Sequence, residues 1–188
     1  MNYICHSGGC PGSDMEWETQ GKKYGVKTIS YSFYNHVQKG ENQRILTGAE
    51  LSEGFEHVKI ASVALKRSPN IQSLYVKHLL CRNWFQVKNS EAIFAIAKSM
   101  TDTMVEGGTG WAVQMAIDSH KPVYVFDQVD NVWRHYNYVF VGFELFNIMN
   151  GIPVLSQNFA GIGTRDINEN GKKAIQKILE CNLRCIQQ

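Results

Sequence analysis

Three glycine-rich segments hold the residues best suited to bind an anion. They are Ser7–Asp14, Glu106–Gln114 and Phe159–Asp166. Glycine lets backbone amides approach an anion closely, and the free N–H groups at a helix N-terminus attract negative charge. The sequence predicts that each segment follows a strand and precedes a helix. The alternative is that they are simple tight turns, with Ser13 or Asp14 as the N-cap of the first helix.

Two arginines stand where they could meet a phosphate group. Arg165 ends the third segment, and its forked guanidinium could make a bidentate contact; the alternative is a surface arginine paired with Asp166 or Glu169. Arg82 and Gln86 are four residues apart, so they share one face of a predicted helix and could point into the same crevice. The alternative for them is an ordinary helix C-terminus, with the aromatic residues between them in the core.

The candidate residues follow from these segments. Three carboxylates near the glycines are candidates for acid–base catalysis: Asp14, Glu16 and Glu106. The candidate ligand-binding residues are Ser7, Gly8, Gly9, Gly12, Ser13, Arg82, Asn83, Gly107, Gly108, Thr109, Gly110, Trp111, Gln114, Gly161, Gly163, Thr164 and Arg165. Among the aromatic residues that could stack on a base, Trp111 is favoured because it directly follows a glycine loop, whereas most of the others are expected in the core.

The elements that must position these residues alternate between strand and helix. Strands are expected at 2–6, 26–33, 91–97, 122–126 and 158–163, with a further strand or strand edge at 152–155. Helices are expected at 12–24, 49–67, 70–87, 111–119 and 168–183, and a loop at 34–47, while 128–150 is aromatic and unassigned. The uninterrupted apolar run Ala92–Ala97 is typical of a parallel strand covered on both faces.

This order predicts an α/β fold of the Rossmann-like kind, a parallel sheet with helices on both faces. One domain over residues 1–188 is expected, with the helical segment 49–87 inside it. Glycine loops at the carboxyl ends of neighbouring strands define a crevice in such folds, so the loops predict a phosphate or ribose site there.

Composition excludes several other classes. The 19 basic and 17 acidic residues leave a net charge of +2, and no cluster of Lys and Arg suggests DNA or RNA as a partner. No signal peptide and no membrane span is evident, which predicts a cytoplasmic protein without a membrane partner.

Five cysteines without a CxxC pair predict reduced thiols and no metal site, although a phosphate ligand could bring Mg²⁺. The aromatic run 133–149 suggests a dimer interface, and hence a homo-oligomer.

Taken together, four blocks resemble the SLOG superfamily, which includes the Lonely Guy (LOG) or lysine decarboxylase-like proteins, the DprA-type fold, and small proteins of phage and bacterial genomes. The matching blocks are Ser7–Asp14, Arg82–Val87, Gly107–Ala112 and Phe159–Arg165. The resemblance implies a nucleotide-binding Rossmann-like fold. In the family the block matching Phe159–Arg165 comes first, so the order here is that of a circular permutation, which predicts that the last helix ends near Met1.

The resemblance also bears on catalysis. LOG enzymes cleave a nucleoside monophosphate with a glutamate that aligns with Gln114, and glutamine cannot act as a general base. Three functions therefore stay open. The first is a sensor or sequestering protein for a nucleotide, which could be an NAD-derived signal. The second is a nucleotide N-glycosidase or phosphoribohydrolase, and the third is an interaction protein without a ligand. The preferred interpretation is the sensor or sequestering protein, which requires no cofactor.

Overall fold

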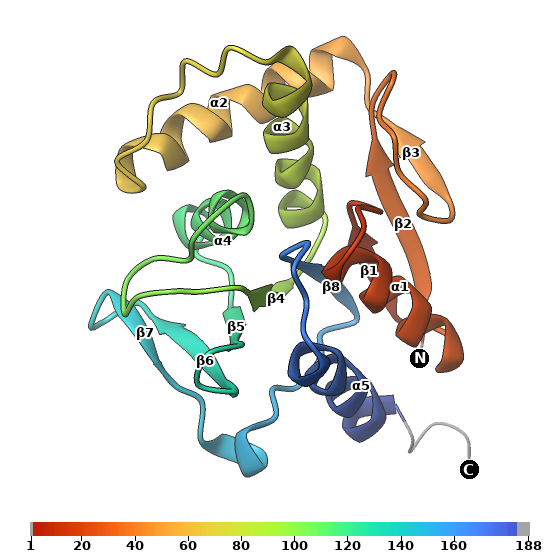
Figure 1. Cartoon of the computed structure of the whole chain (residues 1–188), viewed down its shortest axis with the longest axis vertical. Coiled ribbons are helices and arrows are strands. Elements are labelled where there is room, and N and C mark those ends of the chain that lie inside the picture. Colours follow the sequence, from red (N-terminus) through yellow and green to blue (C-terminus); the bar gives the residue numbers. More distant parts are fainter. Residues whose placement is uncertain (1, 184–188) are drawn as a thin grey trace.

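Eight strands form one sheet in the order β3-β2-β1-β8-β4-β5-β6-β7 (Figure 1). The computed structural model describes residues 2–183, apart from the side chain of Asn150. The strands are β1 (Ile4–Ser7), β2 (Lys27–Ser32), β3 (Gln43–Ile45), β4 (Ala92–Ala97), β5 (Val123–Asp127), β6 (Val132–Asn137), β7 (Gly142–Leu145) and β8 (Asn158–Gly163). The helices are α1 (Ser13–Lys23), α2 (Gly48–Ala64), α3 (Leu74–Lys88), α4 (Thr109–Asp118) and α5 (Glu169–Leu183), with a 3₁₀ turn at Ile148–Gly151.

The last strand of the chain lies in the centre of the sheet. β8 pairs in parallel with β1 on one side, where Ile4 faces Asn158, and with β4 on the other, where Ala92 faces Phe159. Counted from β8, the central strands β2-β1-β8-β4-β5 read 3-2-1-4-5, which is the order of doubly wound nucleotide-binding folds. The α/β, Rossmann-like prediction is confirmed. The reversal of strand order falls between β8 and β4.

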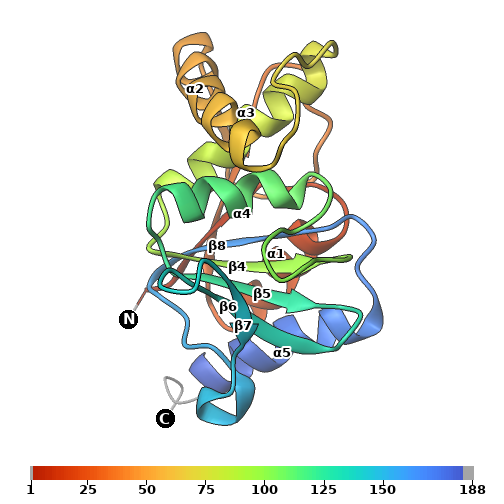
Figure 2. The same cartoon turned by 90° about the vertical axis from the view of Figure 1, so that its left-hand side faces the viewer.

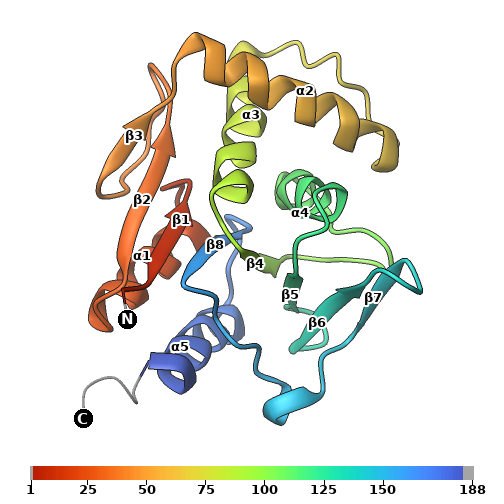
Figure 3. The same cartoon turned by 180° about the vertical axis from the view of Figure 1, so that it is seen from behind.

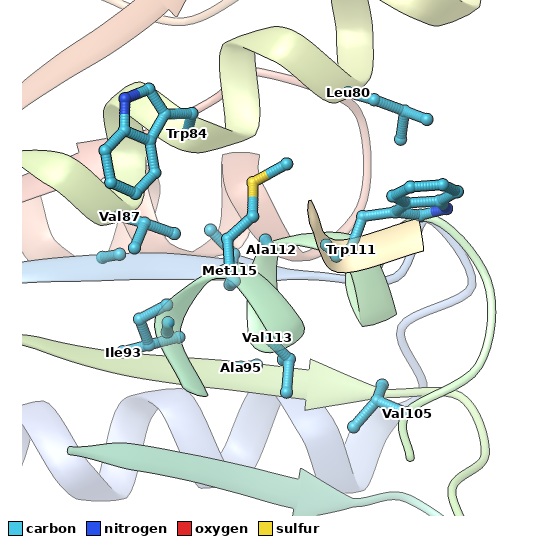
Figure 4. Close-up of a cluster of buried hydrophobic side chains, with 14 of the residues drawn as sticks. Leu80, Trp84, Val87, Ile93, Ala95, Val105, Trp111, Ala112, Val113 and Met115 are labelled. Carbon is cyan, nitrogen blue, oxygen red and sulfur yellow. The ribbon is translucent and has the colours of Figure 1, made fainter. Parts of the chain in front are cut away.

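Helices cover both faces of the sheet (Figure 2). One buried cluster combines residues of α2, α3 and α4 with β4 and β5, and a second combines α1 and α5 with the other face of the sheet. All six residues of β4 are buried, as its continuous apolar run predicted. Figure 4 shows part of the first cluster, where Leu80 and Trp84 of α3 and Met115 of α4 lie over Ile93 and Ala95 of β4.

The two ends of the sheet differ in strand direction. The parallel strands β2 and β3 lie at one end, and the hairpin of β6 and β7 lies at the other (Figure 3). β5 pairs with β6, and β6 with β7, in the antiparallel sense, so the parallel sheet carries an antiparallel hairpin at this end. The hairpin occupies the aromatic stretch that the sequence left unassigned. At its tip Val139, Phe140 and Val141 are exposed.

Two of the predicted segments are wrong. The expected loop 34–47 contains β3, which adds an edge strand beside β2. The expected strand at 152–155 is irregular instead, because α5 satisfies its backbone in place of a neighbouring strand. The Asn182 side chain accepts a hydrogen bond from the Leu155 amide at 3.0 Å and donates one to the Pro153 carbonyl at 3.1 Å.

The end of α5 lies near the beginning of β1. Tyr3 and Leu183 lie near the two ends of the described chain, and Tyr3 packs against the buried cluster to which Leu183 belongs. Met1 lies outside the described residues, so the prediction that the last helix ends near it stays a prediction. No helix within residues 2–183 has the length and apolar character needed to cross a membrane.

Candidate functional site

A cavity of about 600 Å³ opens beyond the carboxyl ends of β8 and β4, where the strand order reverses. Open α/β sheets bind ligands at this position, because the connections of the two halves diverge there and leave a crevice. The volume lies within the range of small-molecule sites, which is about 300–1,000 Å³. The loops after β1, β4 and β8 and one side of α3 form its walls.

The structure brings about half of the predicted residues to this cavity. Those that line it are Asp14, Arg82, Asn83, Glu106, Gly107, Gly108, Thr109, Gly163, Thr164 and Arg165. Those that do not line it are Ser7, Gly8, Gly9, Gly12, Ser13, Glu16, Gly110, Trp111, Gln114 and Gly161.

The Ser7–Gly12 loop mainly binds other parts of the protein. The Gly9 amide donates to the Ser7 hydroxyl at 3.1 Å, and the amide and hydroxyl of Ser13 both donate to the Thr164 carbonyl, at 3.0 and 2.7 Å. At Gly12, where φ is 97°, a Cβ atom would lie 2.5 Å from the Arg165 backbone. Glycine is therefore required where the first and third loops touch, and the first loop supports the third.

The predicted N-cap of α1 is wrong. Gly12 occupies that position, and no side chain caps the helix. Asp14 lies one residue inside the first turn, and its carboxylate instead accepts a hydrogen bond from the Cys10 amide at 3.3 Å. This turns the carboxylate back over the loop and toward the cavity.

Asp14 and Arg82 form a buried pair in the cavity wall. The two side chains approach to 3.8 Å. Burial raises the pKa of Asp14 from 3.8 to about 6, and the nearby Arg82 guanidinium only partly opposes this. Arg82 also donates to the Gly8 carbonyl and, at 3.3 Å, to the Asn83 side-chain oxygen. A carboxyl that titrates near pH 6 can exchange protons at neutral pH, which is the property a general acid or base needs.

Two buried donors in this wall have no protein partner. Arg82 Nε and Gln86 Nε2 make no hydrogen bond within the part of the chain that the structure describes. Both residues line the cavity, and Gln86 is only 1% exposed. A buried donor without an acceptor costs about 1–3 kcal/mol, and a ligand oxygen would recover that free energy only if these side chains moved, because neither nitrogen is exposed to the cavity.

Arg165 is an unpaired cation at the cavity. Asp166 pairs with Lys98 at 2.7 Å and Glu169 pairs with Lys172 at 2.7 Å, so neither of the partners considered for Arg165 is bound to it. Within residues 2–183 its exposed guanidinium forms no ion pair or hydrogen bond. It therefore has all its donors available for an anion.

The Glu106–Thr109 loop presents the first turn of α4 to the cavity. Gly108 is the N-cap, and no side chain accepts a hydrogen bond from this turn. A Cβ at Gly108 would meet nothing within 4 Å, which leaves the backbone open to an approaching group. Ser99 donates to the Glu106 carboxylate, and Arg67 donates to the Gly107 carbonyl at 2.8 Å, so both sides of the loop are held.

Four of the predicted residues have other roles in the structure. Trp111 is 6% exposed and lies among the core side chains shown in Figure 4, with the Arg67 guanidinium 5.9 Å from its ring. Gln114 donates to Asp118 at 2.8 Å, and Glu16 accepts from Gln20 at 2.6 Å. Gly161 allows Trp17 to pack on β8, because a Cβ there would lie 2.7 Å from the indole.

The cavity also contains residues that the sequence did not single out as ligand contacts. They are Cys10, Val76, Leu79, Leu80, Lys98, Ser99, Ala112, Ile162 and Asp166. Gln86, which was expected to share the cavity-facing side of its helix with Arg82, also lines the cavity. Lys98 and Ser99 directly follow the buried strand β4, so the carboxyl-end rule would have found them. The apolar residues of α3 carry no such signal, because a helix face toward a cavity and one toward the core have the same spacing.

Comparison of the chain with protein-family models, with curated proteins and with solved structures gives no significant match. Among residues 2–183 no group of three or more His, Cys, Asp or Glu side chains is arranged to hold a metal ion. The function must therefore be argued from the cavity itself.

Proposed function

We propose that this protein binds a phosphorylated, nucleotide-type small molecule in the cavity between β8, β4 and α3, as a sensor or sequestering protein. The observation that carries the proposal is that an unpaired Arg165 and the uncapped first turn of α4 line one cavity. Both favour an anion, the first by charge and the second through its N–H groups and the helix dipole.

The two ends of the cavity suit the two ends of such a ligand. The phosphate would lie near Arg165 and the Gly107–Thr109 turn, while Val76, Leu79 and Leu80 offer an apolar surface to a base. The side chains of Arg82, Asn83 and Gln86 stand in the same wall and add polar groups to it. Three cations and three carboxylates line the cavity, and the pairs Arg82–Asp14 and Lys98–Asp166 leave Arg165 and Glu106. Glu106 is held by the Ser99 hydroxyl, so Arg165 is the cation that would meet the phosphate.

A second candidate is hydrolysis of the N-glycosidic bond of such a nucleotide. The specific observation in its favour is Asp14, a buried cavity carboxyl whose pKa is about 6. Protonated Asp14 could give a proton to a departing base, and ionised Asp14 could take one from water. Gln114, which stands where the LOG enzymes carry their glutamate, contacts Asp118 instead of the cavity.

Native mass spectrometry of the purified protein, beside a denatured extract of the same sample, tests the proposal. We expect a bound mass that matches a nucleotide, nucleoside phosphate or NAD-derived compound. An intact ligand supports binding, whereas free base with ribose phosphate supports hydrolysis.

An empty protein is then titrated with nucleoside monophosphates, nucleoside diphosphates and ADP-ribose in a thermal-shift assay. No shift with any of these would reject nucleotide binding. It would favour the third function, an interaction protein that uses its glycines only for turns.

A further inference from the structure

A cysteine of the cavity wall, Cys10, contacts a histidine that in turn contacts a serine. Cys10 Sγ lies 3.7 Å from His36 Nε2, and the Ser32 hydroxyl lies 3.2 Å from His36 Nδ1. Cys10 comes from the loop after β1, whereas Ser32 ends β2 and His36 comes from the loop after it. A thiol next to an imidazole that a third group orients is the arrangement of an activated nucleophile.

The imidazole is neutral near pH 7, so it can accept a hydrogen bond from the thiol, but it is a weaker base than a free imidazole. Burial lowers the pKa of His36 to about 4, and the positive charges of Arg82 and Arg165 add to this effect. The ring stacks on Phe33, with centroids 4.6 Å apart and 10° between the planes, which fixes its orientation. With the Nδ1 proton directed at Ser32, the Nε2 lone pair faces the thiol.

The surroundings of the thiol also favour its reaction. An Arg82 nitrogen lies 3.6 Å from Cys10 Sγ, and a guanidinium in contact with sulfur stabilises a thiolate. Cys10 is partly exposed and lines the cavity, so a small molecule can reach it. The unpaired Arg165 guanidinium lines the same cavity and favours an anionic molecule there.

We propose that Cys10 is a nucleophilic thiol, with His36 as its proton acceptor, and that it exchanges with small anionic disulfides that enter the cavity. As Cys10 Sγ attacks one sulfur of the disulfide, its proton moves to His36 Nε2 in the same step. A new S–S bond forms as the old one breaks, and the departing thiolate takes the proton from His36. The products are a mixed disulfide at Cys10 and one free thiol. This activity goes beyond the proposed ligand binding and does not depend on it.

Glutathione disulfide is the probe that tests the proposal. The full chain is incubated with it, samples are quenched over time, and tryptic peptides are analysed by mass spectrometry. Cys181 serves as an internal reference, since it is exposed on α5 and contacts no base or cation within residues 2–183. Cys5 and Cys81 are buried, so their modification reports unfolding.

We expect Cys10 to react at least about tenfold faster than Cys181. His36→Ala should reduce the Cys10 rate to near that of Cys181, and added imidazole should restore part of it, which a purely structural role of His36 would not allow. Equal rates at Cys10 and Cys181 in the unchanged protein would overturn the proposal. An unchanged rate of Cys10 modification in His36→Ala would reject the role of His36 as proton acceptor. If Cys5 and Cys81 react in His36→Ala, that variant is unfolded, and Ser32→Ala is used in its place. An unchanged rate of Cys10 modification in Ser32→Ala would reject the role of Ser32 in orienting the imidazole.

Discussion

The Lys98 ammonium contacts the Asp166 carboxylate at 2.7 Å, across the carboxyl ends of β4 and β8. Both groups are exposed, so the pair adds little to stability. The Lys98–Asp166 pair matters because it decides which charged groups of the cavity stay available. It removes Asp166 as a partner for the adjacent Arg165 and leaves that guanidinium as the available cation of the cavity.

Arg165→Ala should therefore weaken ligand binding without weakening the fold. A hydrogen bond to a charged group contributes about 1.5–3 kcal/mol, so we expect a loss of about 10- to 100-fold in affinity for a nucleoside phosphate. Isothermal titration calorimetry measures the affinity, and the urea midpoint should stay unchanged because the Arg165 side chain forms no ion pair or hydrogen bond within residues 2–183. Arg44→Ala is the matched control, since Arg44 pairs with Glu50 away from the cavity. Equal losses in the two variants would contradict the assignment.

Two glycines of the predicted site should separate ligand contact from packing. Gly108→Ala adds a methyl group into open space beside the first turn of α4, so stability should change by less than about 0.5 kcal/mol. Anion binding should weaken by about 1 kcal/mol, a factor of about five, because the backbone is less accessible. Gly161→Ala should instead cost about 1–3 kcal/mol, since its Cβ would overlap Trp17.

Urea denaturation and a ligand titration on both glycine variants give the comparison. A destabilised Gly108→Ala with unchanged affinity would show that Gly108 serves only the turn.

The pH dependence of stability should reveal the buried Asp14 carboxyl. Its pKa in the folded protein is about 6, above the ordinary 3.8, so the folded state holds the proton more tightly than the unfolded state does. The folded protein therefore loses stability as the pH rises from about 4 to about 6, by about 3 kcal/mol if the two values hold. Below about pH 4 both states are protonated and this contribution vanishes.

Asp14→Asn should remove that pH dependence. Urea denaturation of both proteins between pH 4 and pH 7 measures it, and the variant should gain stability relative to the unchanged protein as the pH rises. Asp166→Asn is the control, because its carboxyl is exposed and its pKa is lowered by Lys98. Parallel pH curves for the unchanged protein and Asp14→Asn would reject an elevated pKa.

The sequence predicts elements well where neighbouring residues determine the structure, and poorly where residues distant in the chain determine it. Ala92–Ala97 was correctly assigned as a covered strand, because six apolar residues in a row leave few other choices. β3 was missed, because Gln43–Ile45 is exposed and takes its strand conformation from pairing with β2. The segment 152–155 looked like a strand, but its hydrogen bonds go to Asn182, a partner about 30 residues away that no local pattern indicates.

The candidate site shows the same division. Gly108 and Arg165 were found because a glycine turn and a cation after a strand have a local signature. Trp111 was expected at the ligand because it follows that turn, yet the direction of a side chain on a helix depends on what packs there, and α3 turns it into the core. His36 lay in a segment predicted to be a loop, and only the fold brings it to Cys10.

Gln114 gives a final test of how the cavity relates to hydrolysis. Its side chain donates to Asp118 at 2.8 Å and does not line the cavity. Gln114→Glu would introduce a glutamate at this position but place two carboxylates one helical turn apart. Like charges at this spacing repel, so we expect a loss of roughly 0.5 kcal/mol in stability and no release of free base from a nucleoside monophosphate. Chromatography of the reaction mixture and urea denaturation measure the two effects. Turnover that appears in Gln114→Glu and disappears with Asp14→Asn added would show that position 114 can reach the ligand after all.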